Sequence, residues 1–239
     1  TGLQSAHPSY DWNGRKVNAG WVTTFNERAV ISENRLTVIP QSLGLDIAAL
    51  YGCALTTGFG AISKNAQVRI GESVVIIGVG GVGMAAVMAA QLSGAQPIVA
   101  LDLHDDKLQL AKEFGATHVI NSRDMKASEI DSAVREIVGG QGSDVVLENT
   151  GVPALIETAY HLASKQGRTI LVGVQEHDHP VKLDTMPLHF GKFLTGSHGG
   201  DTTPEHDIPR YVGLQQSGRF DPSPMVSKRV SLEKINDGI

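Results

Sequence analysis

The chain has 239 residues, of which 41% are apolar and 19% charged, with a formal net charge of -5. This length suits one large domain, or one domain plus part of another. Acidic and basic residues are mixed along the chain, so nothing indicates a nucleic acid or an anionic membrane as partner, and the longest apolar runs are too short to cross a bilayer. The lone cysteine, Cys53, excludes an internal disulfide framework and indicates a reducing, cytoplasmic location.

The two ends of the chain predict a piece of a longer protein. The sequence begins at Thr1 without a methionine or a signal peptide. It ends in "LEKINDGI", which is typical of the start of a helix rather than of a finished terminus.

The first part of the chain predicts irregular β structure, or the end of a β domain. Short β-like runs occupy residues 20–25, 28–32 and 36–40, and Pro40 closes the region. From Ser42 to Lys64 the apolar residues take helical spacing.

Beyond this region, short apolar runs alternate with amphipathic segments. The expected strands are residues 73–78, 97–102, 118–121, 144–149, 168–174 and 192–197. The expected helices are residues 82–93, 105–114, 126–138, 153–164 and 203–216. Apolar strands alternating with helices predict an α/β fold, a doubly wound parallel sheet of the Rossmann type with helices on both faces.

A glycine cluster joins the first of these strands to its helix. Gly78 would permit a tight turn, Gly80 would let a pyrophosphate approach the backbone, and Gly83 would let helix and strand pack closely. The helix N-terminus, with Gly81 and Val82, offers unpaired N–H groups and the positive end of a dipole. The order of strand, glycine turn and helix predicts a dinucleotide site.

Asp102 ends the second strand, 19 residues after Gly83. A carboxylate there can accept hydrogen bonds from both hydroxyls of an adenosine ribose and would repel a 2′-phosphate. No arginine follows closely, so the sequence favours NAD over NADP. Lys107 is a further candidate on the adenosine side, although a solvated helix lysine fits equally well. The alternative for the whole motif is a tight turn whose acid only caps the next helix.

The stretch "YGCALTTGFGAI" around Cys53 carries a more specific signal. Together with "GESVVIIGVGGVG", "AKEFGATHVIN", "DVVLENTG" and "GRTILVGV", it resembles the zinc-dependent medium-chain alcohol dehydrogenases. The resemblance covers essentially the whole chain. It implies three segments: residues 1–42 as the tail of a GroES-like catalytic domain, residues 43–200 as the NAD-binding domain, and residues 201–239 as the last helix and an incomplete return to the catalytic domain.

The resemblance implies that Cys53 is a ligand of a catalytic zinc in the intact protein. A thiolate is a strong ligand for Zn²⁺, and the metal would polarise the alcohol oxygen. Thr57, one helical turn further on, matches a residue beside the nicotinamide ring. The alternative is that Cys53 is a small buried hydrophobe, as lone cysteines usually are.

The family's other zinc ligands, a second cysteine and a histidine, have no counterpart in this chain. One cysteine cannot make a tetrahedral site, so we expect this chain to bind cofactor without turning over alcohol. His177 and His179 could face the same way on an extended loop and bind a metal ion. A solvated polar loop is the favoured interpretation. His198 is expected near the nicotinamide end, without a role in proton transfer.

The resemblance also implies where the carboxamide of the nicotinamide lies. By match, the backbone around Val172, Val174 and Ser197 would hold it, and Val82 would pack behind the ring. The strand at residues 192–197 is expected at a sheet edge, where it would pair with a second copy. A homodimer or homotetramer is therefore expected.

The function expected from these features is NAD-dependent oxidation of an alcohol to an aldehyde or ketone, assisted by zinc in the intact protein. The alcohol itself is not specified by the sequence. Two alternatives stay open: a zinc-free, quinone-reductase-like enzyme of the same superfamily, and a non-catalytic dinucleotide-binding or oligomerisation module.

Overall fold

A computed structural model describes residues 9–18, 25–29 and 31–238. The chain divides into two compact units, one of residues 39–225 and one drawn from residues 1–38 and 226–239. Each unit is described by itself. The division into segments at residues 42 and 200 stays a prediction.

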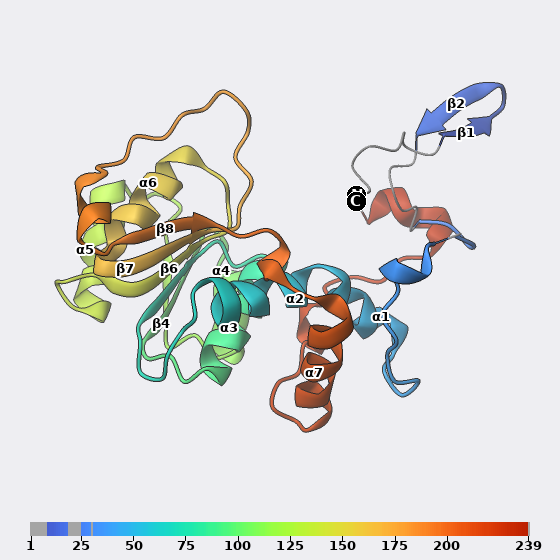
Figure 1. Ribbon diagram of the computed structural model, residues 1–239, viewed down its shortest axis with the longest axis horizontal. Helices are drawn as coiled ribbons and strands as arrows, with labels where there is room; N and C mark the ends of the chain where they lie inside the picture. Colours follow the sequence, from blue (N-terminus) through green and yellow to red (C-terminus); the bar gives the residue numbers. More distant parts are fainter. Residues whose placement is uncertain (1–8, 19–24, 30, 239) are drawn as a thin grey trace. The chain divides into compact units, whose positions relative to one another are not determined.

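The unit of residues 39–225 is built on one sheet of six parallel strands (Figure 1). The strands are β3 (Val74–Ile77), β4 (Ile98–Asp102), β5 (His118–Asn121), β6 (Ser143–Glu148), β7 (Ala163–Leu171) and β8 (Phe193–Gly196). Their order is β5-β4-β3-β6-β7-β8, so the chain starts in the middle of the sheet and winds outward in both directions. This confirms the predicted doubly wound α/β fold.

Helices cover both faces of this sheet. They are α3 (Gly81–Leu92), α4 (Asp105–Glu113), α5 (Ala127–Val138) and α6 (Pro153–Leu162). The helix α7 (Pro204–Gln216) instead packs against α2 (Ala54–Gly60), where the rings of Tyr211 and Phe59 meet. In Figure 1, α5 and α6 lie on one side of the strands, and α3 and α4 lie on the other. Each segment was expected as a helix from its apolar spacing.

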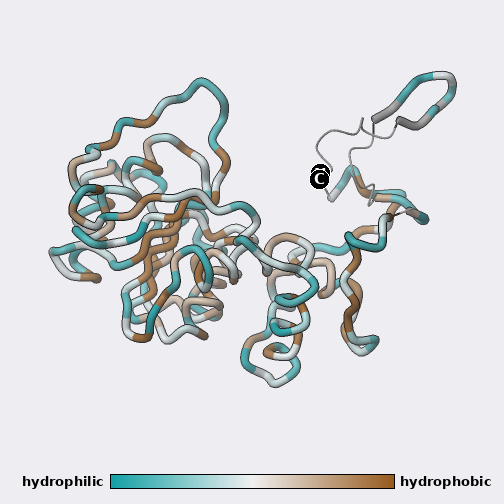
Figure 2. The backbone as a smooth tube through the Cα atoms, in the orientation of Figure 1, coloured by the Kyte–Doolittle hydropathy of each residue, from teal (hydrophilic) through white to brown (hydrophobic). Residues whose placement is uncertain are grey.

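The two faces of the sheet make two cores because side chains alternate along each strand. Val74 and Ile76 of β3 enter one core, while Val75 and Ile77 enter the other. All four side chains are buried, and the central strands form the brown runs in Figure 2. Burying an aliphatic side chain of this size contributes about 1.5–3 kcal/mol relative to leaving it exposed, which explains why β3 reads as an unbroken apolar run.

Residues 42–64 are largely helical, as their spacing predicts, but they do not form one continuous helix. The structure has α1 (Leu45–Ala48), the 3-10 helix η3 (Ala49–Gly52), α2 (Ala54–Gly60) and the π-helix η4 (Ala61–Asn65). The break is at Cys53, whose φ of -150° and ψ of -69° are not helical. Cys53 instead serves as the N-cap residue of α2, and its carbonyl accepts a hydrogen bond from the Thr57 N–H at 2.9 Å.

In the other unit, the structure corrects the predicted β runs. Residues 36–40 form no strand, and the strands present are β1 (Ser9–Trp12) and β2 (Arg15–Asn18), paired antiparallel. Their turn is Asn13-Gly14, both with positive φ, which is the Asn-Gly signal of a two-residue hairpin. Most of the run at 20–25 and Val30 lie outside the described residues. Residues 33–35 and 232–237 form 3-10 helices, η2 and η8, so the helix expected at "LEKINDGI" is present as a 3-10 helix.

Among the described residues, no single helix is long and apolar enough to span a membrane. One pair, Leu45–Gly52 with Ala54–Asn65, meets the length and composition criteria together but is bent by 47°. In this pair, Leu55, Phe59 and Ile62 are buried in the core.

A buried acid joins α7 to η4. The Asp207 side chain is 4% exposed; it pairs with Lys64 and accepts a hydrogen bond from the Thr203 N–H at 2.7 Å. Burial acts to raise the pKa of Asp207, but hydrogen bonds from Lys64 and Thr203 and the charges of Lys64 and Arg210 outweigh it, so that the pKa is lowered. Asp207 therefore stabilises the fold in its ionised form.

We expect Asp207→Asn to lower the free energy of unfolding by about 1–3 kcal/mol at pH 7. Because the folded-state pKa is lowered, the contribution of Asp207 is complete above its ordinary pKa near 4 and is lost as the pH falls below it. Urea unfolding between pH 7 and pH 2.5 should thus show the two proteins converging below about pH 4. A difference that stays constant with pH would contradict this assignment; Asp106→Asn, at an exposed site on α4, is the control.

Candidate cofactor site

The glycine turn lies at the carboxyl end of β3. Gly78 has a φ of +83°, a conformation that favours glycine. Gly80 is the N-cap of α3 and has no side-chain oxygen to satisfy the first N–H groups of the helix. These N–H groups, from Gly81 to Gly83, are the ones that have no partner within a helix. Such a helix start is suited to binding an anion.

Gly83 is closely packed and Gly80 is open, as the motif predicts. A Cβ added to Gly83 would lie 2.1 Å from the Gly78 carbonyl oxygen, so α3 packs on the turn at a distance that only glycine allows. A Cβ on Gly80 would meet no atom within 4 Å. The backbone at Gly80 is therefore open, and these residues fit the diphosphate of a dinucleotide.

Asp102 ends β4 and contacts the turn directly. Its Oδ2 accepts a hydrogen bond from the Val79 N–H at 2.9 Å, and its Oδ1 accepts from Leu103 N–H at 2.8 Å and His104 N–H at 3.1 Å. A carboxylate has about four acceptor positions, so this one retains capacity for a ribose hydroxyl. The structure thus brings together the acid and the glycines that the sequence singled out.

Arg123 is a neighbour that the sequence reasoning missed. Its Nε and Nη2 donate to the Leu103 carbonyl at 3.1 and 2.7 Å, and Nη2 lies 3.4 Å from His104 Nδ1. Arg123 is far from Asp102 in sequence because it follows β5, the next strand in the sheet. The pairing of β4 with β5, which sets Asp102 opposite Asn121, is the signal that could have found it. Lys107 lies nearby in sequence on α4 and is partly exposed.

A second missed residue is Glu148, a fully buried acid at the end of β6. Its carboxylate accepts hydrogen bonds from the Thr150 N–H at 2.7 Å and the Gly151 N–H at 3.0 Å, and from the Thr150 hydroxyl. Thr150 in turn sits against the turn, because a Cβ on Gly78 would lie 2.7 Å from its Cγ2. Glu148 therefore fixes the segment that borders the glycine turn.

The residues expected at the nicotinamide end follow β7 and β8. Val172 is partly buried against the core, while Val174 is 92% exposed and lines a hollow of about 370 Å³ with residues 150–153, Glu176 and His179. Ser197 Oγ donates to Asn65 Oδ1 at 2.7 Å and accepts from the Gly200 N–H at 3.1 Å. The Ser197 N–H also donates to the Leu171 carbonyl at 2.8 Å, which leaves the Ser197 carbonyl as the group that could meet a ligand.

Cys53 is exposed at the start of α2, and that start approaches the glycine turn: a Cβ on Gly81 would lie 3.5 Å from the Ala54 Cβ. Thr57, one turn along, is buried. In the described part of the chain, no group of three or more His, Cys, Asp or Glu side chains is arranged to hold a metal ion. Those residues alone therefore do not fit a complete zinc site.

The candidate histidines do not gather at one place. His177 and His179 are exposed, and His179 Nδ1 lies 3.9 Å from Glu176 Oε2. His198 is also exposed and begins the short 3-10 helix η6 (Gly199–Asp201).

Residues 81–217 match a family model described as "Zinc-binding dehydrogenase". The chain belongs to the zinc-binding dehydrogenase family. The match covers more than half of the chain and begins inside the glycine turn, so the resemblance inferred from the Cys53 and glycine motifs is confirmed.

Similar proteins of this family carry alcohol dehydrogenase names. The chain is 33% identical over 217 residues to Alcohol dehydrogenase-like 5 of Arabidopsis thaliana, and 34% identical over 223 residues to the NDMA-dependent alcohol dehydrogenase of Amycolatopsis methanolica. In each case 90% of this chain is covered, but the chain spans only 56% and 58% of the relatives' lengths.

Solved structures agree with the fold. The alcohol dehydrogenase zinc-binding domain protein from Burkholderia ambifaria matches with a TM-score of 0.81 at 37% identity, covering 88% of this chain and 56% of that one. The benzyl alcohol dehydrogenase from Acinetobacter calcoaceticus matches with a TM-score of 0.81 at 32% identity, covering 88% and 57%.

A matched pair of glycine substitutions tests the packing at the turn. We expect Gly83→Ala to destabilise the protein by about 2 kcal/mol or more, because its methyl would press on the Gly78 carbonyl. Gly81→Ala should be tolerated, because its methyl would make an ordinary contact at 3.5 Å. Equal midpoints of urea unfolding for the two variants would contradict the assigned role of Gly83.

Proposed function

We propose that this chain is the dinucleotide-binding part of an NAD-dependent oxidoreductase that oxidises an alcohol to an aldehyde or ketone. The observation that carries the proposal is the open backbone at Gly80 beside Asp102, whose carboxylate is bonded to the Val79 N–H of the same turn. The family membership and the names of the similar proteins support alcohol as the substrate class.

Each binding residue has a distinct task in this proposal. The N–H groups of Gly81, Val82 and Gly83 bind the diphosphate, and Asp102 accepts hydrogen bonds from the adenosine ribose. The backbone at Val172, Val174 and Ser197 orients the carboxamide, which would fix the ring face presented to the alcohol. When bound, the nicotinamide supplies the hydride acceptor.

The charge at the ribose favours NAD in this proposal, because Asp102 would repel a 2′-phosphate. The positive charge of Arg123 acts in the opposite direction and would attract a 2′-phosphate, because its guanidinium contacts Leu103, the residue after Asp102. The name of the Amycolatopsis relative specifies NDMA dependence, so the acceptor can differ between similar proteins.

In the intact protein, Cys53 is proposed as one zinc ligand, because it is exposed at the start of α2 near the glycine turn. The remaining ligands would come from outside the residues described here. A zinc-free reductase of the same superfamily is the alternative, and metal analysis of the intact protein distinguishes the two. A non-catalytic dinucleotide-binding module is the second alternative, favoured if the intact protein binds cofactor but oxidises no alcohol.

We also propose that the protein forms a homodimer or homotetramer through β8. This strand is the last in the sheet order, so its outer edge has no partner strand within the described unit. Exposed apolar side chains adjoin it, among them Phe190 at 72% and Phe193 at 46%. Sedimentation analysis of the intact protein should find dimers or larger species, and Thr195→Pro should dissociate them. A monomeric intact protein would exclude this arrangement.

Substitution of Gly80 separates cofactor binding from folding. We expect Gly80→Ala to leave the unfolding midpoint unchanged, since its methyl meets no protein atom. The methyl would occupy the position of the diphosphate, so the Kd for NADH should rise about tenfold or more, a loss of about 1.4 kcal/mol. NADH fluorescence titration measures it, with Gly213→Ala, whose methyl is equally unobstructed on α7, as control. Equal NADH affinity in both variants would refute the turn as the diphosphate site.

Asp102 is expected to control the choice of cofactor. Asp102→Ala should weaken NADH binding and relax the discrimination against NADPH by about tenfold, because the repulsion of the 2′-phosphate is removed. Titrations of both cofactors provide the ratio. An unchanged ratio would count against the assignment of Asp102, and Asp106→Ala serves as the control on the neighbouring helix.

A further inference from the structure

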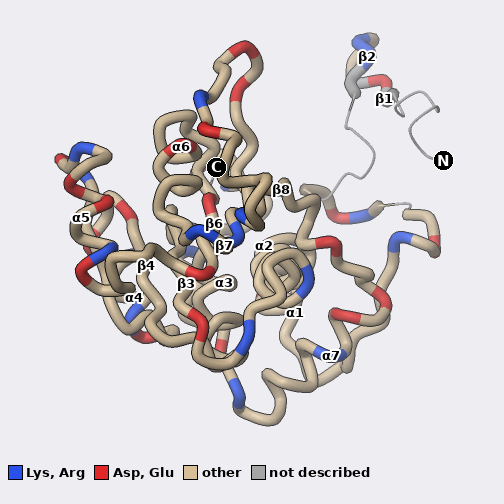
Figure 3. The backbone as a smooth tube through the Cα atoms, turned by 60° about the vertical axis from the view of Figure 1, so that its left-hand side comes forward, with Lys and Arg blue, Asp and Glu red and all other residues tan. Residues whose placement is uncertain are grey.

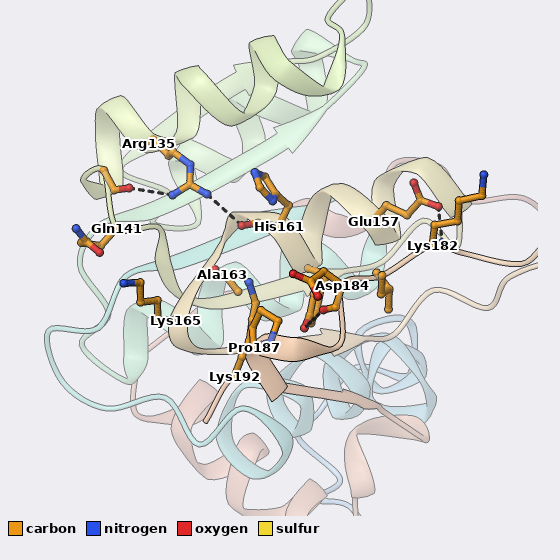
Figure 4. A pocket seen from close by; sticks show the side chains of 13 residues that line it. Arg135, Gln141, Glu157, His161, Ala163, Lys165, Lys182, Asp184, Pro187 and Lys192 are labelled. Atoms are coloured by element: carbon orange, nitrogen blue, oxygen red, sulfur yellow. Dashed lines mark hydrogen bonds between the residues drawn. The ribbon is translucent and has the colours of Figure 1, made fainter. Parts of the chain in front are cut away.

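A second hollow lies at the opposite end of the sheet from the glycine turn. It has a volume of about 430 Å³ and opens where β7 begins at Ala163, between the ends of α5 and α6 and the segment that leads to β8 (Figure 4). Pockets of about 300–1,000 Å³ hold small molecules. Nothing in the proposed function uses this place.

Positive charge dominates the lining of this hollow. Arg135, Lys165, Lys182 and Lys192 line it together with only two carboxylates, Glu157 and Asp184. The lining carries two more cations than acids, and one more once Arg135 is set against its ion-pair partner Asp131, 2.8 Å away and outside the lining. The net charge of the chain is -5. Elsewhere acidic and basic positions are interspersed, as along α4 and α5 in Figure 3. This local excess favours an anion.

Lys192 is the central cation. It is half-buried; its Nζ donates to the Ala163 carbonyl at 2.8 Å and stands 4.5 Å from the centre of the Tyr160 ring. It takes part in none of the ion pairs formed within the described residues. Burial and the nearby Arg135 lower the pKa of Lys192, although Asp184 acts in the opposite direction. The Lys192 ammonium therefore has donor capacity beyond the Ala163 carbonyl, and it forms no ion pair with an acid of the described residues.

The walls of the hollow are fixed by hydrogen bonds. Arg135 donates from Nη1 to the Gly140 carbonyl at 3.0 Å and from Nη2 to the His161 carbonyl at 3.1 Å, which joins the ends of α5 and α6. The Tyr160 hydroxyl donates to the Asp184 carbonyl at 2.8 Å, which holds the segment leading to β8 against α6. The cations are thus presented from a preformed frame.

Each of the two carboxylates is held by a backbone N–H. Glu157 Oε1 accepts from the Lys182 N–H at 2.7 Å, and Asp184 Oδ1 accepts from the Met186 N–H at 3.0 Å. In Figure 4, Glu157 and Lys182 lie toward one end, while Arg135, Gln141 and Lys165 lie toward the other. The end with Lys165 and Gln141 therefore offers donors without a carboxylate of the lining beside them.

We propose that this hollow binds the phosphate group of a small hydroxylated phosphate ester. The phosphate oxygens accept hydrogen bonds from Lys192, Lys165 and Gln141, because lysine ammonium groups bind phosphate as compact charges. Hydroxyl groups on the rest of the molecule donate to Glu157 and Asp184. The shared chemistry is the phosphate, and free inorganic phosphate is the simpler source that the experiment must separate from an ester.

The test is a titration of the ¹⁵N-labelled chain with inorganic phosphate, followed through amide chemical shifts at constant ionic strength. We expect saturable shifts at Gly140, Ala163 and Lys192, and a Kd about tenfold higher in Lys192→Gln, from the loss of one charge-assisted hydrogen bond. Lys112→Gln, which removes an exposed lysine on α4, should leave the Kd unchanged. Chloride replaces phosphate in the blank titration.

Shifts confined to residues 78–83 would overturn the proposal, because phosphate would then bind only at the glycine turn. Linear, unsaturated shifts, or equal Kd values for wild type and Lys192→Gln, would also overturn it. Glycerol 3-phosphate should bind at least threefold more tightly than inorganic phosphate; equal affinity would refute the ester. The proposed cofactor site is read separately from residues 78–83, so either site can fail without the other.

Discussion

The contact between Gly83 and the Gly78 carbonyl is the constraint on which the rest of the cofactor end depends. With 2.1 Å available to an added Cβ, only a hydrogen at Gly83 lets the first turn of α3 rest on the end of β3. The close packing places the unpaired N–H groups at the start of α3 next to Gly80, where the backbone is open. The same requirement for small residues continues into the second layer, where a Cβ on Gly58 would lie 2.5 Å from the Ala85 Cβ. Close packing, rather than flexibility, explains Gly83 and Gly58.

Two acids hold the strand ends around this turn. Asp102 binds the Val79 N–H from β4, and Glu148 binds the N–H groups of Thr150 and Gly151 from β6. Both accept from backbone donors that the change from strand to loop leaves without sheet partners. One of them remains partly exposed and able to meet a ligand, while the other is fully buried and serves the frame. Both carboxylates accept backbone hydrogen bonds, but only the partly exposed Asp102 can also bind a ligand.

Much of the sheet could be predicted because its central strands are apolar on both faces. The β3 strand lies within one run, so its position, direction and connection to α3 followed from periodicity and the glycines. The interruption at Cys53 could not be predicted, because "LYGCALTT" keeps helical spacing across the break. The hairpin at residues 9–18 was missed although Asn13-Gly14 announces its turn, because its strands are only four residues long.

The site was predictable where its residues are neighbours in sequence and not where the sheet joins them. Gly78 to Gly83 form one stretch, and Asp102 follows at a familiar spacing. Arg123 and Glu148 reach the same end of the sheet from other strands, so only the strand order reveals them. The hollow beside Lys192 combines residues from α5, α6 and the segment before β8, which no local pattern connects.

The hydrogen bond from the Val79 N–H to Asp102 ties the glycine turn to the end of β4, and this bears on the kinetics of binding. A turn that the protein itself holds in place loses little conformational entropy when a molecule enters it, so association should be fast and nearly rigid. An arriving hydroxyl must share the carboxylate with an amide that already holds it. Loss of the Asp102 carboxylate would thus alter residence time more than encounter rate.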